Sequence, residues 1–113
     1  MRDDRLYLIH IAECIDRILL YTADGRDAFF GDTRTQDAVL RNPHVLTEST
    51  QRISEELRQQ HPEVAWRETA RFRNVVVHQY LGIDLLRVWD IIERDLPILR
   101  RQVRAMLQEM DKS

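Results

Sequence analysis

The stretch LIHIAECIDRILLYT, residues 8–22, decides the fold. Its apolar side chains recur at every third or fourth position, the spacing that places them along one face of an α-helix. We expect this helix to run from about Asp4 to Ala23 and to end at Gly25, with its apolar stripe facing a core. The stripe consists of Leu8, Ile11, Ile15, Ile18, Leu19 and Thr22.

The same spacing continues after this helix, and only three Gly and three Pro interrupt the chain. A short turn is expected around residues 28–30. A second helix is expected from Thr33, where Gln36 completes a capping-box spacing, to Gln60. Pro43 lies inside this helix and predicts a kink or a break there, because proline lacks a backbone donor and clashes with the preceding turn.

Two further helices are expected in the second half of the chain. The third begins near residues 64–66 and ends at Gly82. The fourth is capped by Asp84, runs to about Glu109 and is bent at Pro97. Short links between four helices are typical of neighbours that run in opposite directions.

The sequence therefore predicts an all-α fold, an up-and-down four-helix bundle with kinks near Pro43 and Pro97. A length of 113 residues fits one domain, residues 1–113. The longest apolar run is too short to cross a membrane and the N-terminus does not resemble a signal peptide, so we expect a cytoplasmic protein. The single cysteine, Cys14, excludes an internal disulfide.

The basic residues are almost all arginine. The chain has 16 Arg and one Lys, with a formal net charge of −2. The guanidinium group suits phosphate recognition, but an acidic chain does not coat nucleic acid by bulk attraction. Any contact with nucleic acid is therefore expected at a local cluster of arginines, although arginines on a solvated helix face explain the composition equally well.

The first and last helices are more apolar than the outer surface of an isolated bundle requires. Ile9 and Ile11, for example, lie about 160° apart on a straight helix, so one stripe cannot bury both. A second copy of the chain would cover such a surface, which favours a homodimer.

The densest set of reactive side chains lies in RFRNVVVHQY, residues 71–80. An Arg-x4-His pair is expected by chance about 0.6 times in this composition, and Arg5 and His10 share that spacing. Adding a Tyr two positions after the His lowers the chance expectation to about 0.02, and only Arg73, His78 and Tyr80 meet it. A structural explanation, with His78 and Tyr80 in the core and the arginines in solvent, stays open at this point.

The segment resembles the hallmark Arg-x4-His-x-Tyr of the HepT-like ribonuclease toxins of the HEPN superfamily, in which Asn often follows the Arg. The resemblance covers most of the chain. The departures are Thr47-Glu48-Ser49 in place of the usual Gly-Glu-Ala, and Arg71 in place of a small residue. The other matching positions are residues 35–39, Arg41, Asn42, Glu48, residues 62–66, Asp84, Trp89 and residues 96–99.

This resemblance implies a HEPN-like bundle that acts as a metal-independent endoribonuclease toxin of a type VII toxin–antitoxin pair. It implies that Arg73 and His78 are catalytic and that no cofactor is needed. Asn74 and Arg71 are expected in supporting roles because residue spacing, not the resemblance, places them on the face of His78. The resemblance further implies that Tyr80 accepts AMP from an MntA-type nucleotidyltransferase antitoxin, and that RNA binds in a composite cleft at the two-fold axis of a homodimer.

Helix geometry adds a constraint of its own. Five positions on a straight helix rotate by about 500°, so Arg73 and His78 point about 140° apart. Either the helix unwinds before His78, or Arg73 of one copy meets His78 of the other. Arg71 and Asn74 share a face with His78, which makes Asn74 a candidate to orient the imidazole.

Several weaker hypotheses remain. His10, Glu13 and Cys14 have a spacing that would place three metal ligands on one helix face. A basic run on the last helix, if not simply solvated, would guide RNA; it consists of Arg94, Arg100, Arg101 and Arg104. At the level of function, the alternatives are a non-catalytic subunit that binds a nucleotidyltransferase or its nucleotide, and a purely structural bundle.

Overall fold

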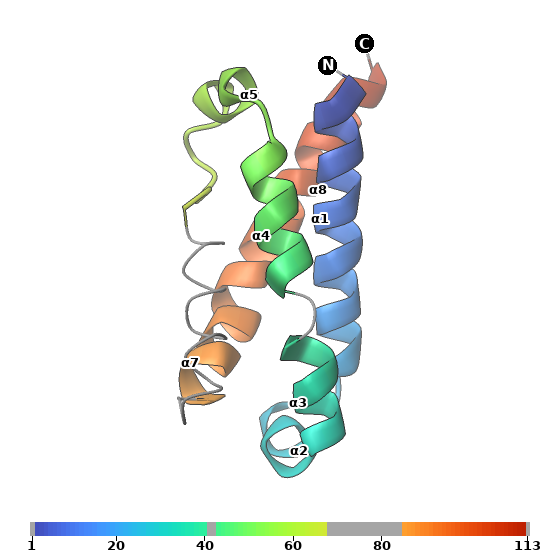
Figure 1. Cartoon of the computed structure of the whole chain (residues 1–113), viewed down its shortest axis with the longest axis vertical. Coiled ribbons are helices and arrows are strands. Elements are labelled where there is room, and N and C mark those ends of the chain that lie inside the picture. Colours follow the sequence, from blue (N-terminus) through green and yellow to red (C-terminus); the bar gives the residue numbers. More distant parts are fainter. Residues whose placement is uncertain (1, 41–42, 68–84, 113) are drawn as a thin grey trace.

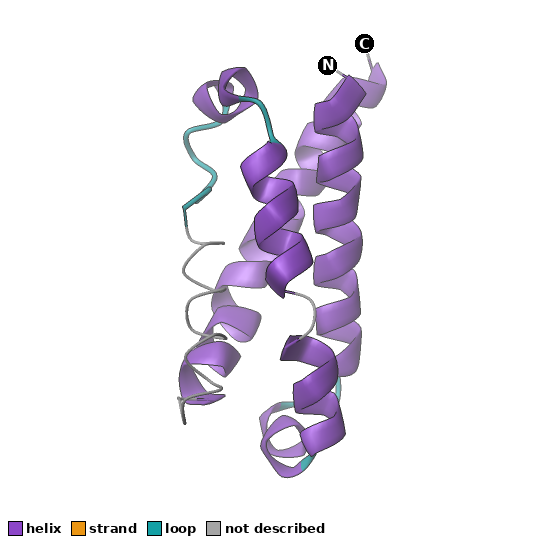
Figure 2. Ribbon diagram, in the orientation of Figure 1, coloured by secondary structure: helices purple, strands orange, loops and turns teal. Residues whose placement is uncertain are grey.

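The computed structural model of the chain describes residues 2–40, 43–67 and 85–112. All regular elements in these ranges are helical, which confirms the all-α prediction, and none of the helices is both long and apolar enough to cross a membrane (Figures 1 and 2). The number of long helices stays a prediction, because most of the third one would lie in residues 68–84. The elements are α1 (Arg2–Tyr21), α2 (Arg26–Gly31), α3 (Thr33–Leu40), α4 (Pro43–Arg52), α5 (Glu55–Gln60), α7 (Leu85–Asp90), η1 (Ile91–Asp95) and α8 (Leu96–Lys112).

Helix α1 is the centre of the core and packs along both α4 and α8 (Figure 1). The predicted stripe is confirmed, with Leu19 only partly buried. Each fully buried aliphatic side chain contributes about 1.5–3 kcal/mol relative to exposure, so this stripe is a main source of stability. The side chains of Leu8, Ile11, Ile15 and Ile18 are 0% exposed.

The region after α1 differs from the prediction. A turn at residues 22–24 leads to Gly25, whose φ of +96° is a left-handed conformation that favours glycine. The expected turn around residues 28–30 is wrong, because these residues belong to α2. This short helix buries Phe29 in the core, which explains why the chain coils here instead of crossing directly to α3.

The predicted capping box at Thr33 and Gln36 is also wrong. Asp32 caps α3, since its carboxylate accepts hydrogen bonds from the Arg34 backbone N–H at 2.9 Å and from the Thr35 hydroxyl at 3.0 Å. Gln36 instead donates from Nε2 to the carbonyl oxygens of Phe29 and Phe30 at 2.9 and 3.1 Å. Its side chain therefore ties α3 to the end of α2.

The kink or break expected at Pro43, near Arg41 and Asn42, lies outside the described residues, since α3 is described to Leu40 and α4 from Pro43. The prediction of one helix continuing to Gln60 is wrong, because α4 ends at Arg52 and α5 starts after Ser54. The Ser54 hydroxyl accepts a hydrogen bond from the Leu57 backbone N–H at 3.2 Å and so caps α5.

A carboxylate from α1 holds this break in place. Asp4, whose residue is 3% exposed, accepts the Ser54 backbone N–H at 2.7 Å and the Ser54 hydroxyl at 2.6 Å. Two hydrogen bonds to one carboxylate fix the direction in which the chain leaves α4. The start of α1 thus determines where α5 begins, across 50 positions of sequence.

The last predicted helix is divided by a π-helical turn. Between α7 and α8, η1 spans Ile91–Asp95, and the Leu96 backbone N–H donates to the Ile91 carbonyl five positions earlier. Pro97 has no backbone N–H to donate to the carbonyl oxygen four positions earlier, as an α-helix requires. A π-helical turn before the proline accommodates this missing hydrogen bond. The helix geometry thus changes directly before Pro97, while the bend expected at Pro97 stays a prediction.

Ion pairs join α1 to α8 on one side of the core. The Asp16 carboxylate lies 2.6 Å from Arg100 Nε and 3.1 Å from Arg104 Nη2. Partial burial raises the pKa of Asp16, but the hydrogen bonds from the two arginines outweigh it and hold that pKa below its ordinary value of 3.8.

We expect Asp4→Ala to lower the free energy of unfolding by about 2 kcal/mol, because it leaves the partly buried donors of Ser54 without an acceptor. Equilibrium urea unfolding followed by circular dichroism measures this loss. Asp3→Ala is the matched control, since Asp3 lies in the same first turn of α1 but is exposed. Asp3→Ala should lower the free energy of unfolding by no more than about 0.5 kcal/mol. Equal decreases for both variants would contradict the role of Asp4.

We expect Asp16→Asn to cost about 1 kcal/mol at pH 7, since the ion pairs are partly exposed to solvent. A carboxylate with a depressed folded-state pKa stabilises the fold above its unfolded-state pKa and loses that effect as the pH falls through the folded-state value. The stability difference between wild type and variant should therefore be constant from pH 7 to pH 5 and shrink below about pH 4. Urea unfolding at each pH measures it, and a difference that grows on acidification would contradict the assignment.

Candidate functional site

The predicted site residues all fall in residues 68–84. Arg71, Arg73, Asn74, His78 and Tyr80 therefore lie outside the described residues, as does the predicted helix cap Asp84. Their mutual placement stays a prediction. The structure describes the frame on either side of them, which ends at Arg67 and resumes at Leu85.

A tight turn fixes the chain before the motif. The His61 carbonyl oxygen accepts the Val64 backbone N–H at 3.2 Å and the Trp66 indole N–H at 3.0 Å. Gln102 of α8 donates to the Glu63 carbonyl oxygen at 3.1 Å. The sequence prediction of a helix start at residues 64–66 is wrong, because residues 61–67 form turns and no helix begins among them.

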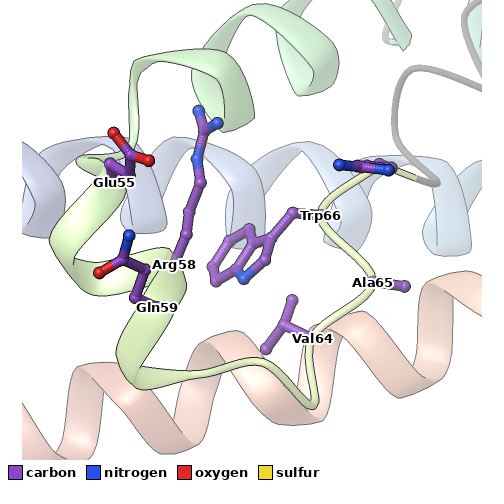
Figure 3. Close-up of a pocket in the computed structure, with 7 residues that line it drawn as sticks. Glu55, Arg58, Gln59, Val64, Ala65 and Trp66 are labelled. Atoms are coloured by element: carbon purple, nitrogen blue, oxygen red, sulfur yellow. The ribbon is translucent and has the colours of Figure 1, made fainter.

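A pocket of about 680 Å³ opens between α5 and this turn (Figure 3). Figure 3 shows the Trp66 indole lying between Arg58 and Val64. No pattern in the sequence indicates this pocket, because its two halves have no periodic relation and meet only through the turn at His61. Its lining residues are Glu55, Arg58, Gln59, Val64, Ala65, Trp66 and Arg67.

Aromatic packing holds the chain after the motif. Trp89 of α7 stacks at a tilt on the buried Phe29, with ring centroids 5.5 Å apart, and Val88 is fully buried beside it. A smaller hollow of about 290 Å³ adjoins this contact, with Arg26, Arg87 and other side chains of α7 and η1 around it. Helix α7 lies at the end of the molecule opposite α5, so the two anchors are well separated (Figure 1).

The basic run on the last helix is mostly paired within the chain. Arg100 and Arg104 bind Asp16, and Arg94 lies 3.8 Å from Asp90. Three of the four arginines therefore have a carboxylate partner, and Asp16 serves two of them. This arrangement weakens the hypothesis that the run guides RNA and favours a role for Arg100 and Arg104 in joining α8 to α1.

The spacing of His10, Glu13 and Cys14 does not produce a metal site. In the described ranges no three side chains of the metal-binding types gather together. Cys14 is 1% exposed, and burial raises the pKa of its thiol to about 11, so the thiol stays protonated near neutral pH. Cys14 is therefore a small side chain of the core.

Comparison with known proteins identifies one family over nearly the whole chain. The sequence model described as "Ribonuclease HepT-like" matches residues 11–106, a span that contains the complete segment 71–80. No solved structure gives a significant match.

Individual relatives support the same family. A protein of Thermococcus cleftensis named "Probable ribonuclease HepT" is 35% identical over 100 residues, which cover 88% of this chain and 91% of the relative. A Methanocaldococcus jannaschii protein named "Gamma-glutamylcyclotransferase and putative RNase MJ0434" is 33% identical over 113 residues. That match covers 99% of this chain but 51% of the relative, so this chain spans about half of that protein.

Proposed function

The chain belongs to the HepT-like ribonuclease family, and on that premise we propose that it is an endoribonuclease that acts as the toxin of a toxin–antitoxin pair. The observation that carries the proposal is the combination of Arg73, His78 and Tyr80 inside the span that the family matches. The relative named as a ribonuclease is aligned over most of both chains, which supports the same activity for the single domain.

The proposed reaction uses the 2′-hydroxyl of the RNA as the nucleophile. One His78 imidazole removes the proton of this hydroxyl, and the 2′-oxygen forms a new bond to the adjacent phosphorus. The bond from phosphorus to the 5′-oxygen breaks, and a second, protonated imidazole donates a proton to that oxygen. The products are a 2′,3′-cyclic phosphate and a 5′-hydroxyl end, and no step requires a metal ion or a cofactor.

Arg73 has the complementary role in this proposal. Negative charge grows on the phosphoryl oxygens as the five-coordinate transition state forms, and a fixed guanidinium stabilises it there. Asn74 orients the imidazole by a hydrogen bond to its second nitrogen. Arg71 lies on the same helical face by residue spacing and adds positive charge near the strand.

A homodimer provides both imidazoles and resolves the angular separation of Arg73 and His78. Exposed apolar side chains on α1 and on the helices after the motif support self-association, since burying them on a second copy is favourable. Leu20 is 71% exposed and Leu86 is 55% exposed. Tyr21 and Ile98 are also exposed on these helices.

The described frame supports a site in residues 68–84 from both ends. The Trp66 indole is hydrogen-bonded to the turn before the segment, and Trp89 is packed on Phe29 after it. A catalytic constellation needs its supporting backbone held in place, because small displacements reduce the rate. The two tryptophans provide such fixed points.

We further propose that the antitoxin is an MntA-type nucleotidyltransferase that transfers AMP to Tyr80. In that reaction the tyrosine oxygen attacks the α-phosphate of ATP, pyrophosphate leaves, and the phenolic proton passes to a base. Each AMP adds bulk and one negative charge beside the motif. At about 5 Å and an effective dielectric near 20, repulsion of an RNA phosphate is about 3 kcal/mol, roughly a hundredfold loss of binding.

We expect His78→Ala to reduce RNA cleavage by about 10²- to 10⁴-fold, because it removes the general acid–base group. A fluorogenic RNA assay measures the rate, and end-group analysis should find 2′,3′-cyclic phosphate. EDTA should leave the wild-type rate unchanged.

The matched control is His10→Ala, which removes an exposed histidine that also follows an arginine by five positions, and it should cleave like wild type. Equal activity of the two variants would favour a non-catalytic subunit. Loss of cleavage in EDTA with recovery on adding a divalent ion would contradict the metal-independent mechanism.

We expect Tyr80→Phe to retain RNA cleavage but to escape neutralisation by the antitoxin, because phenylalanine has no hydroxyl to accept AMP. Intact-mass spectrometry after co-expression should show added AMP on wild type and on Tyr21→Phe, which removes an exposed tyrosine on α1. An antitoxin that neutralises the toxin while Tyr80 stays unmodified would overturn the proposal.

A further inference from the structure

We propose that the pocket between α5 and the turn before the motif binds one nucleotide of the RNA strand, next to the nucleotides at the cleaved bond. This inference rests on the proposed ribonuclease function. We define the nucleotide pocket by Arg58, Trp66 and Arg67, the side chains that combine positive charge with an aromatic face. The pocket volume of about 680 Å³ is within the range usual for small-ligand sites.

Arg58 provides a guanidinium that is fixed but not neutralised. Its Nη2 donates to the carbonyl oxygens of Thr50 and Gln51 at 2.8 and 2.7 Å, which holds it at the C-terminal end of α4. Its Nε is buried and has no hydrogen-bond partner. No ion pair joins it to a carboxylate of the described chain, although Glu55 also lines the pocket.

Arg67 adds a second guanidinium to the lining, and it is exposed. With Glu55 as the one acidic group of the lining, the two arginines leave the pocket positively charged on a chain whose formal net charge is −2. A local positive site on an acidic protein selects an anionic ligand, and a guanidinium matches the geometry of a phosphate.

Trp66 provides the aromatic surface. The hydrogen bond from its indole N–H to the His61 carbonyl oxygen fixes the ring, so little conformational entropy is lost when a base stacks on it. The ring is partly exposed and lies between Arg58 and Val64 (Figure 3). Aromatic side chains beside cationic ones are the combination that binds single-stranded RNA.

The position of the pocket along the chain favours an RNA strand as the source of this nucleotide. Arg73 follows Trp66 by seven positions, so their Cα atoms lie at most about 25 Å apart even on an extended chain. That limit keeps the pocket within reach of nucleotides that flank the one bound at the motif. The pocket then holds a flanking nucleotide and contributes affinity and preference for sequence context.

Quenching of Trp66 fluorescence tests the stacking directly. The full chain carrying Trp89→Phe has Trp66 as its single tryptophan. The probe is an RNA of about 12 nucleotides with 2′-O-methyl groups, which block cleavage without removing the bases or phosphates. We expect strong quenching at saturation, and no quenching of Trp89 in the reciprocal variant Trp66→Phe. Unquenched Trp66 in saturated protein, or failure of the protein to bind the probe, would overturn the proposal.

Binding constants and their salt dependence test the two side chains separately. We expect Trp66→Leu to weaken binding about tenfold and Trp66→Phe, which keeps a ring, to weaken it less than about threefold. Arg67→Ala should weaken binding and reduce the slope of log K against log salt by about 0.7. Arg17→Ala, which removes an exposed arginine of α1 outside the pocket, is the control and should leave the slope unchanged.

The remaining outcomes separate this inference from the nuclease proposal. Binding by Trp66→Leu and Arg67→Ala equal to that of Arg17→Ala would reject the pocket, while cleavage of unmodified RNA would leave the nuclease proposal intact. The predicted binding pattern without any cleavage would support the pocket and reject the nuclease. If AMP alone quenches Trp66 as strongly as the RNA probe does, the pocket binds a free nucleotide and the strand assignment is overturned. If Trp66→Leu and Arg67→Ala bind RNA normally but are no longer neutralised by the antitoxin, the pocket is a protein contact and the assignment is likewise overturned.

Discussion

Burial of one apolar stripe of α1 between α4 and α8 is the constraint on which the described fold depends. Leu8, Ile11, Ile15 and Ile18 lose all contact with solvent there. The polar contacts at the edges of this core then fix its neighbours: Asp4 sets where α5 begins, and Asp16 joins α1 to α8. The frame around the candidate site is therefore built outward from the first helix.

The elements that could be predicted from sequence are those that depend on local pattern. The stripe of α1 follows from the periodicity of its apolar residues. The split between α4 and α5 was not predictable, because it depends on a contact between Asp4 and Ser54 across 50 positions. The pairing of Arg100 and Arg104 with Asp16 was not predictable for the same reason.

The candidate site also has a part that could be predicted from sequence and a part that could not. Residues 71–80 are recognisable from sequence, because the order of Arg73, His78 and Tyr80 is improbable by chance and lies within the matched family span. The pocket lined by Arg58 and Trp66 has no such signature, since the two residues come together only when the turn between them closes. A motif can be recognised from sequence because its residues are close together along the chain. A cleft cannot, because it forms only when separate segments pack against each other.

The central claim is that Arg73 of one protomer and His78 of its partner form one active site. Mixing wild type with an equal amount of His78→Ala tests this directly, because their heterodimer keeps one imidazole and the proposed reaction uses one from each protomer. With random subunit exchange only the wild-type homodimers stay active, and we predict about a quarter of the cleavage given by the same total amount of wild type. Half of that cleavage, in a mixture shown by differently tagged subunits to contain the heterodimer, would contradict a site shared between protomers.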